Sequence, residues 1–254
     1  MFIERKKELK KLNTLYDSGK FQLTILYGKR NTGKTTLIKE FCKNKKVIYL
    51  AGKCADESVQ LRHFCHEIET RCKNIIFNNE TFNYSLNLNN WEDIFNCIYQ
   101  LSKSQRIVFV MDEYQYLTET GTHFSIQLND FIKNKFSSSQ VFLILCSSSI
   151  DYIKDKLVKS DEYLYQKYHA LLHIHPFHYF EMKFLFPEYT PEEQLLLYGI
   201  TNGMPGYLSN IDANLSVRNN IINLYLTENG ILYQEVFHFM NAVFREPSTY
   251  NSII

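Results

Sequence analysis

The 254-residue sequence lacks a strong excess of charge of either sign. It has 28 Lys and Arg against 27 Asp and Glu, which gives a formal net charge of +1. A strong basic excess is the simplest signature of proteins that bind nucleic acid or anionic membranes. Its absence removes that argument, although a local basic patch is still compatible with the overall balance.

Long apolar runs are also lacking. No segment approaches the roughly 18 consecutive apolar residues that a membrane-spanning helix needs. The first eight residues, MFIERKKE, are charged where a secretory signal peptide is apolar. We therefore expect a soluble, cytoplasmic protein without a membrane partner.

Paired cysteines and early prolines are missing as well. None of the six cysteines forms a C-x-x-C pair, and most lie among apolar residues. This pattern favours buried free thiols over a zinc site or disulfides. All five prolines follow residue 175. Because proline interrupts regular elements, we expect a change of architecture there and two domains, residues 1–175 and 176–254.

The apolar pattern of the first domain predicts alternating strands and helices. Continuous apolar runs indicate strands covered on both faces, as in a parallel sheet sandwiched by helices. The expected strands lie at 23–27, 47–50, 107–111 and 141–146, with a short one near 170–174. The expected helices lie at 3–17, 34–44, 57–72, 91–102 and 123–136. The fold class is therefore α/β.

The second domain shows only helical patterns. Its expected helices lie at 178–185, 191–201, 206–212, 216–227 and 230–245. Prolines and glycines separate them, which is typical of short packed helices with tight connections. We therefore expect a small all-helical lid domain after the α/β core.

Residues 28–35, GKRNTGKT, match the motif G-x-x-x-x-G-K-[ST]. This P-loop motif binds phosphate because backbone N–H groups and a helix N-terminus converge on the anion. It lies where a predicted strand ends and a predicted helix begins. Lys34 is expected to reach the β- and γ-phosphates, and the Thr35 hydroxyl to ligate Mg²⁺. The expected nucleotide-binding residues of this segment are Gly28, Lys29, Arg30, Asn31, Thr32, Gly33, Lys34, Thr35 and Thr36.

Polar residues follow two further predicted strands. Asp112 and Glu113 come directly after 107–111, and three serines, Ser147 to Ser149, end the strand 141–146. Ligands in open α/β sheets bind at the carboxyl ends of strands. Beside a P-loop, Asp112 is expected to hold Mg²⁺ and Glu113 to act as the base for an attacking water. For the serines, a γ-phosphate sensor and a simple strand ending stay equally open.

Six segments, in order along nearly the whole chain, carry a resemblance that is more specific than the P-loop alone. They are FIERKKEL at 2–9, YGKRNTGKTTL at 27–37, FVMDEYQ at 109–115, LCSSS at 145–149, NGMPGYL at 202–208 and FREPSTY at 244–250. Together they resemble the archaeal-type ATPases, which are related to AAA+ proteins and close to the signal-transduction ATPases with numerous domains. The resemblance implies a P-loop NTPase core.

The resemblance also implies a ligand and further site residues. It implies an ATP site between core and lid, in which Phe2 and Ile3 flank the adenine and the turn containing Pro205 closes over it. Ser148 is implied as the phosphate sensor. ATP, rather than GTP, is the nucleotide that the resemblance implies.

Two departures from the family pattern bear on catalysis. The family often has L-Y-G-R after the sensor strand, where this chain has Lys167 in place of the arginine. Lysine lacks the bidentate fork of arginine, so as a finger it is the weaker group. The first glycine of the family's G-G-x-P box is Asn202 here.

The expected activity is ATP hydrolysis that drives or regulates an effector, with a neighbouring subunit or domain completing the site. The expected partners are ATP or ADP, a second copy of the chain, and an effector protein or a C-terminal effector domain, since family members commonly continue beyond the point where this chain stops. Two alternatives stay open. One is a nucleotide-dependent switch with little turnover, and the other is a DNA-associated remodelling ATPase, for which only fold-level analogy speaks.

Overall fold

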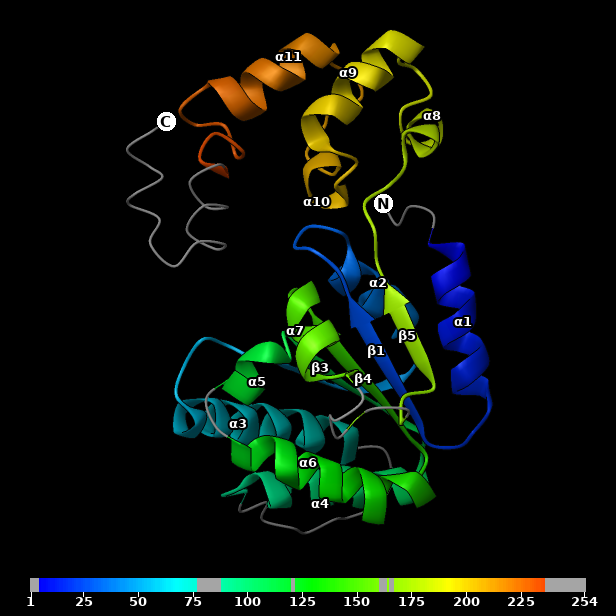
Figure 1. Ribbon diagram of the computed structural model, residues 1–254, viewed down its shortest axis with the longest axis vertical. Coiled ribbons are helices and arrows are strands. Elements are labelled where there is room, and N and C mark those ends of the chain that lie inside the picture. Colours follow the sequence, from blue (N-terminus) through cyan, green and yellow to red (C-terminus); the bar gives the residue numbers. More distant parts are fainter. Residues whose placement is uncertain (1–4, 77–87, 120–121, 160–163, 165–166, 236–254) are drawn as a thin grey trace. The chain divides into compact units, whose positions relative to one another are not determined.

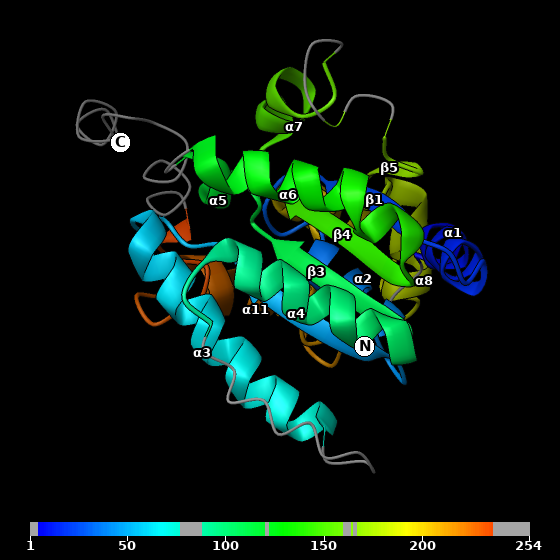
Figure 2. The same ribbon diagram turned by 90° about the horizontal axis from the view of Figure 1, so that it is seen from below.

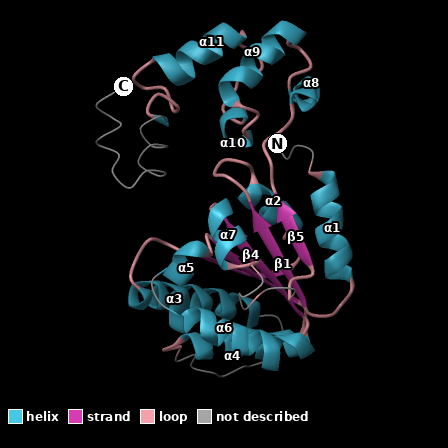
Figure 3. Cartoon of the chain, viewed as in Figure 1, coloured by secondary structure: helices cyan, strands magenta, loops and turns pink. Residues whose placement is uncertain are grey.

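The computed structural model describes residues 5–76, 88–119, 122–159, 164 and 167–235 (Figure 1). The chain divides into two compact units, one formed by residues 2–175 and the other by residues 176–254. We call them the core unit and the helical unit. Strands occur only in the core unit within the described part of the chain (Figure 3).

The core unit is built on a five-stranded sheet in which every strand is parallel to its neighbours. The strands are β1 (Gln22–Tyr27), β2 (Lys46–Ala51), β3 (Ile107–Asp112), β4 (Val141–Ser147) and β5 (Ala170–His173). Their order across the sheet is β2-β3-β4-β1-β5. All five strands were predicted, and because they are parallel, their carboxyl ends meet at one edge of the sheet.

The register of the sheet places β4 between the P-loop strand and the acidic strand. Thr24 of β1 lies beside Ile144 of β4, and Ile144 lies beside Val110 of β3. β3 and β4 are buried at every position. Residues that are apolar on both faces of a strand require cover on both faces, so these sequences specify the interior of a sandwich.

Two layers of helices supply that cover. On one face, α1 (Lys6–Asp17) and α2 (Lys34–Phe41) pack against alternate strand residues such as Val108 and Val110. The other face is covered by α3 (Glu57–Ile76), α4 (Trp91–Ser104), α5 (Gln115–Glu119), α6 (Thr122–Asn134), η1 (Phe136–Ser138) and α7 (Ile150–Lys156). Figure 2 shows α4 and α6 side by side along the sheet. The predicted α/β sandwich is confirmed.

The helical unit consists of short helices. They are η2 (Tyr179–Glu181), α8 (Met182–Leu185), α9 (Pro191–Thr201), α10 (Pro205–Leu208), α11 (Val217–Ile221) and a π-helical segment, η3 (Ile222–Leu226). α9 matches its predicted bounds because a capping box of Thr190 and Glu193 starts it and Asn202, in the left-handed conformation, ends it.

Two other predicted helices of this unit fit less closely. The one expected at 206–212 is confined to α10, and most of the one expected at 230–245 lies outside the described residues. Among the described helices of both units, none is long and apolar enough to cross a membrane.

Candidate nucleotide site

The P-loop connects β1 to α2 through three positions with positive φ. Gly28 has a φ of +156°, and a Cβ there would lie 2.2 Å from the carbonyl oxygen of Ile174. Asn31 has a φ of 63° and Gly33 one of 86°. A side chain at Gly28 would collide with backbone that cannot yield, so β1 and the end of β5 approach this closely only with glycine there.

Lys34 lies at the centre of the loop. Its side chain is buried, and its Nζ donates hydrogen bonds to the carbonyl oxygens of Gly28, at 2.7 Å, and Lys29, at 2.8 Å. Burial lowers the pKa of Lys34, although the nearby Glu113 and Asp112 act in the opposite direction. The hydrogen bonds of the ammonium go to neutral carbonyls, so its charge is well suited to attract a phosphate.

Arg5 stabilises the P-loop through hydrogen bonds to backbone carbonyls. Its Nη2 donates to the carbonyl oxygens of Thr32, at 3.0 Å, and His175, at 2.5 Å. The Thr32 hydroxyl in turn donates to the carbonyl oxygen of Lys29 at 2.8 Å. Arg5 thereby ties the start of α1 to the loop and to the segment after β5. In the sequence, Arg5 is only one residue of the segment FIERKKEL, and its role becomes visible in the folded structure.

Asp112, at the end of β3, gathers donors from several elements. Its Oδ2 accepts from the Thr35 hydroxyl at 3.2 Å and from the phenol of Tyr49 on β2, and its Oδ1 accepts from the Glu113 N–H at 2.9 Å. Burial raises the pKa of Tyr49, and the charge of Asp112 raises it further. Burial raises the pKa of the Cys146 thiol well above its usual value, and Asp112 adds to this. The partly buried phenol of Tyr49 therefore stays a proton donor to the Asp112 carboxylate.

The oxygen set of Thr35 and Asp112 fits Mg²⁺. This ion prefers hard oxygen ligands and is usually bound through one or two carboxylates together with phosphates and water. In the described part of the chain, no group of three or more His, Cys, Asp or Glu side chains is placed to hold a metal. A hydroxyl and one carboxylate beside a phosphate loop are nevertheless the pair that nucleotide-bound Mg²⁺ requires.

Glu113 and Ser148 meet at the carboxyl ends of β3 and β4. The Ser148 hydroxyl donates to Glu113 Oε2 at 2.6 Å, and Gln115 Nε2 donates to the same oxygen at 2.5 Å. Gln115 also donates to Ser148 Oγ at 3.1 Å and accepts from the Ser147 hydroxyl at 2.6 Å. The predicted base and the predicted sensor therefore belong to one hydrogen-bonded group with Gln115 at its centre.

Gln115 and Tyr49 were missed by sequence reasoning. Gln115 is only 3% exposed in the structure. The signal in the sequence was its position two residues after Glu113, within the segment FVMDEYQ. Tyr49 lies within an apolar run, where a tyrosine is commonly a packing residue. Its register beside β3, which places it near Asp112, is visible only in the folded sheet.

The family profile described as an ATPase domain predominantly from Archaea matches residues 2–211. The chain belongs to this family. The predicted resemblance to archaeal-type ATPases is thereby confirmed, and nucleotide binding by a P-loop ATPase domain is the function that this membership carries.

Known proteins resemble this ATPase domain in sequence or in fold. An uncharacterised protein of Methanocaldococcus jannaschii is 26% identical over 254 residues, and the chain spans 53% of that relative's length. A Walker-type ATPase of Pyrococcus abyssi superposes with a TM-score of 0.65 at 20% identity, covering 95% of this chain and 77% of that one. The ORC2 protein of Aeropyrum pernix, solved with ADPNP and ADP, gives a TM-score of 0.54 at 15% identity, covering 93% and 63%.

The remaining predicted residues belong to the P-loop, to α2, to the helical unit or to the part of the chain that is not described. Arg30 and Lys29 are exposed on the loop, and Arg30 Nη2 donates to the Tyr116 hydroxyl at 3.1 Å. Thr36 is exposed on α2. Pro205 begins α10 in the helical unit. Phe2 and Ile3 lie outside the described residues.

Lys167 is not brought to the site within the chain. It precedes β5, so it lies toward the amino ends of the strands, opposite the P-loop edge. Its Nζ donates to Asn129 Oδ1 of α6 at 3.1 Å. Lys167 and the P-loop of the same chain therefore lie at opposite ends of the strands, and the prediction that Lys167 replaces a finger arginine stays a prediction.

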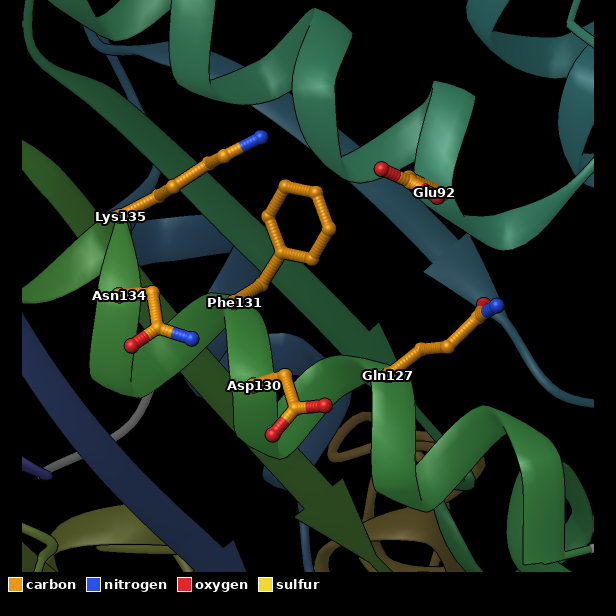
Figure 4. A pocket seen from close by; sticks show the side chains of 6 residues that line it. All are labelled: Glu92, Gln127, Asp130, Phe131, Asn134 and Lys135. Carbon is orange, nitrogen blue, oxygen red and sulfur yellow. The ribbon is translucent and has the colours of Figure 1, made fainter.

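A separate shallow pocket of the ATPase domain lies between α4 and α6 (Figure 4). It is lined by Glu92, Gln127, Asp130, Phe131, Asn134 and Lys135. Lys135 Nζ lies 4.6 Å from the centre of the Phe131 ring and donates to Asn96. None of the predicted nucleotide-site residues lines this pocket, so it is distinct from the P-loop edge.

Proposed function

We propose that this ATPase domain binds ATP together with Mg²⁺ and hydrolyses the γ-phosphate bond. The observation that carries the proposal is the convergence of Lys34, the pair Thr35 and Asp112, and the pair Glu113 and Ser148 at one edge of the sheet. These groups come from α2, β3 and the end of β4. A P-loop cation, an oxygen pair for Mg²⁺ and a carboxylate next to a hydroxyl are the parts that phosphoryl transfer to water needs.

Each group has a distinct part in the proposed reaction. Lys34 turns from the loop carbonyls to the phosphates, and Thr35 with Asp112 holds Mg²⁺, which supplies neutralising charge to the phosphates when bound. Glu113 accepts a proton from the attacking water. To do so its Oε2 must exchange Gln115 and Ser148 for water, and a phosphate that takes the Ser148 hydroxyl frees one of these two contacts.

The replacement Glu113→Gln tests the assigned base. The amide keeps the size of the side chain but takes up no proton, so we expect nucleotide affinity to stay within about threefold while turnover falls at least about a hundredfold. Nucleotide binding is measured with a fluorescent ATP analogue, and turnover by phosphate release.

Lys34→Ala is the companion variant. We expect it to weaken nucleotide binding at least about tenfold, because it removes the buried cation of the loop. Turnover that survives in Glu113→Gln shows that another group is the base. Unchanged nucleotide affinity in Lys34→Ala shows that the loop is not the phosphate site.

A nucleotide-dependent switch is the second candidate function. The engagement of Glu113 by two donors and the position of Lys167 away from the site favour it, because both lower the intrinsic rate of a single chain. Stoichiometric ADP or ATP retained through purification, without measurable turnover, supports the switch. In either case we infer that the nucleotide state is passed on to an effector.

A further inference from the structure

The near-neutral net charge of the chain conceals a strong separation of charge. The first 46 residues contain 13 Lys and Arg against 4 Asp and Glu, whereas residues 47–254 contain 15 against 23. A basic excess concentrated in one segment creates a local positive potential that the overall balance of +1 does not reveal. The segment includes α1, β1, the P-loop and α2, and its lysines on α1 and α2 belong to one helix layer of the core unit.

α1 turns its lysines to solvent. Leu12 is buried in the apolar cluster under this layer, and Leu9, Leu15 and Tyr16 pack partly buried around it. The opposite side of the helix carries four exposed lysines, Lys6, Lys7, Lys10 and Lys11. The amphipathic pattern thus places a whole helix face of positive charge outward.

α2 and the segment after it extend the same layer. Lys39, Lys43 and Lys46 are exposed there. Lys45 has a different role, since its Nζ donates to Asn13 Oδ1 of α1 at 3.2 Å and to the carbonyl oxygen of Phe41 at 2.6 Å. This contact fastens the end of α2 to α1. We call the seven exposed residues, Lys6, Lys7, Lys10, Lys11, Lys39, Lys43 and Lys46, the lysine face.

Few acidic residues lie within the same segment of the sequence. Of the described residues 5–46, only Glu8, Asp17 and Glu40 are acidic. Glu8 lies 3.6 Å from the Arg5 guanidinium, and Glu40 lies 2.6 Å from Lys43 Nζ. The four lysines of α1 therefore share their helix with two carboxylates. One is Glu8, which lies near Arg5, and the other is Asp17, at the end of the helix.

The chemistry of the lysine face selects among polyanions. No large apolar side chain is exposed within described residues 5–51, so the apolar anchors of a membrane-binding helix are missing. Exposed aromatic rings, on which single-stranded bases stack, are missing there too. Lysine contacts phosphates as a flexible point charge. These features match the dense, regular phosphates of a double-stranded nucleic acid, in which the bases are already paired.

We propose that the lysine face binds the phosphate backbone of double-stranded DNA. Lys6 and Lys10, like Lys7 and Lys11, lie one helical turn apart, which is about 6 Å along the axis. Two phosphate steps on one strand of a duplex span about 7 Å along its axis. Backbone contacts of this kind fix position without reading sequence. None of the seven lysines belongs to the P-loop, so the proposal stands independently of ATP hydrolysis.

The test compares two fourfold variants of the full chain. The first replaces Lys6, Lys7, Lys10 and Lys11 by Gln. The matched control replaces Lys103, Lys133, Lys154 and Lys156, four exposed lysines on other elements, by Gln. Binding of a fluorescein-labelled DNA duplex is followed by anisotropy at several salt concentrations from about 50 mM upward.

We expect the α1 variant to lose at least about tenfold in duplex affinity at 50 mM salt. The slope of log affinity against log salt should become shallower by about 2 to 4, since each lost phosphate contact removes about 0.9. The control variant should stay within about threefold of the natural chain. Affinity for a fluorescent ATP analogue should be unchanged in both variants, which separates loss of this surface from failure of the nucleotide site.

Other outcomes overturn the proposal. These are no duplex binding by the natural chain at low salt, an equal loss in both variants, or tighter binding to single-stranded DNA, duplex RNA or phosphatidylserine vesicles than to duplex DNA. If the fourfold α1 variant loses ATP-analogue affinity through misfolding, the single exposed replacement Lys7→Glu takes its place. Unchanged duplex affinity in Lys7→Glu then counts against the lysine face.

Discussion

At the scale of single residues, the carboxylate of Asp112, the proposed Mg²⁺ ligand, is held in place by hydrogen-bond donors from neighbouring elements. Tyr49 and Thr35 both donate to its Oδ2 from different elements. Two donors on one oxygen fix the rotamer of the carboxylate and leave its other oxygen facing the Glu113 N–H. Partners of this kind around a metal ligand commonly set metal affinity as strongly as the ligand itself.

Tyr49→Phe should therefore raise the Mg²⁺ requirement. Loss of the phenolic hydroxyl leaves the ring packed but frees the Asp112 side chain, so we expect the half-saturating concentration of divalent ion to rise about tenfold. The measurement is Mn²⁺ binding by electron paramagnetic resonance in the presence of a non-hydrolysable ATP analogue, which does not depend on turnover.

Two comparisons make this result specific. Nucleotide affinity in EDTA should be equal in the natural chain and in Tyr49→Phe, because the loop contacts of Lys34 are untouched. Tyr99→Phe, which removes a hydroxyl from α4, should leave Mn²⁺ binding unchanged. A Tyr49→Phe protein with natural thermal stability and natural Mn²⁺ affinity would show that the phenol has no bearing on the metal.

At the scale of elements, β5 is the shortest strand and carries a titratable group. His173 stacks on Tyr27 of β1 with ring centres 4.6 Å apart and planes 7° apart. Burial lowers the pKa of His173, and the neighbouring His175 and Lys154 lower it further. The folded chain therefore binds this proton less readily than the unfolded chain does.

The stability of the core unit should consequently fall as the pH drops through the ordinary histidine pKa of about 6.5. Above that pH, His173 is neutral in both states and contributes no penalty. Thermal melts at pH 7.5 and 5.5 measure the difference. His173→Phe keeps an aromatic ring on Tyr27 without a titrating group, so its loss of melting temperature should be smaller. His66→Phe, at an exposed position of α3, is the control, and an equal loss in all three proteins refutes the role of His173.

Elements were predictable where their patterns were long. The strands β3 and β4 are buried throughout, and their continuous apolar runs in the sequence predict them. α5 and α7 were not predicted, because five and seven residues are too few to establish a helical period.

The site was predictable where a motif is local in sequence. The P-loop and the acidic pair are such motifs, whereas the contacts of Tyr49 and Gln115 span 63 and 32 residues. Contacts across the sheet depend on strand order and register, which no local pattern encodes. The position of Lys167 could not be predicted for the same reason. Only the parallel topology places Lys167 at the amino ends of the strands and Lys34 at their carboxyl ends.

At the scale of the whole molecule, the position of Lys167 bears on how the site is completed. P-loop ATPases often receive a cation that stabilises the transferring phosphoryl group from a neighbouring molecule. Lys167 contacts Asn129 of α6 on the far edge from its own P-loop. We expect Lys167 to reach a nucleotide site only from a second copy of the chain, in which case turnover depends on association.

Specific ATPase activity should accordingly rise with protein concentration over about a hundredfold range, because association follows mass action. Glu113→Gln, measured over the same range, gives the background rate. Constant specific activity well above that background would show that one chain suffices for turnover.

The pairing of β1 with β4 also determines when the nucleotide site can form during synthesis of the chain. Gln22 of β1 lies beside Phe142 of β4, a partner 120 residues further along the chain. At about 5 to 20 residues per second of synthesis, β1 waits roughly 6 to 24 seconds for that partner. During this interval the first strand and its glycine loop have no sheet to join. The phosphate loop is thus translated early and assembled late, and a nascent chain acquires a nucleotide site only after β4 has left the ribosome.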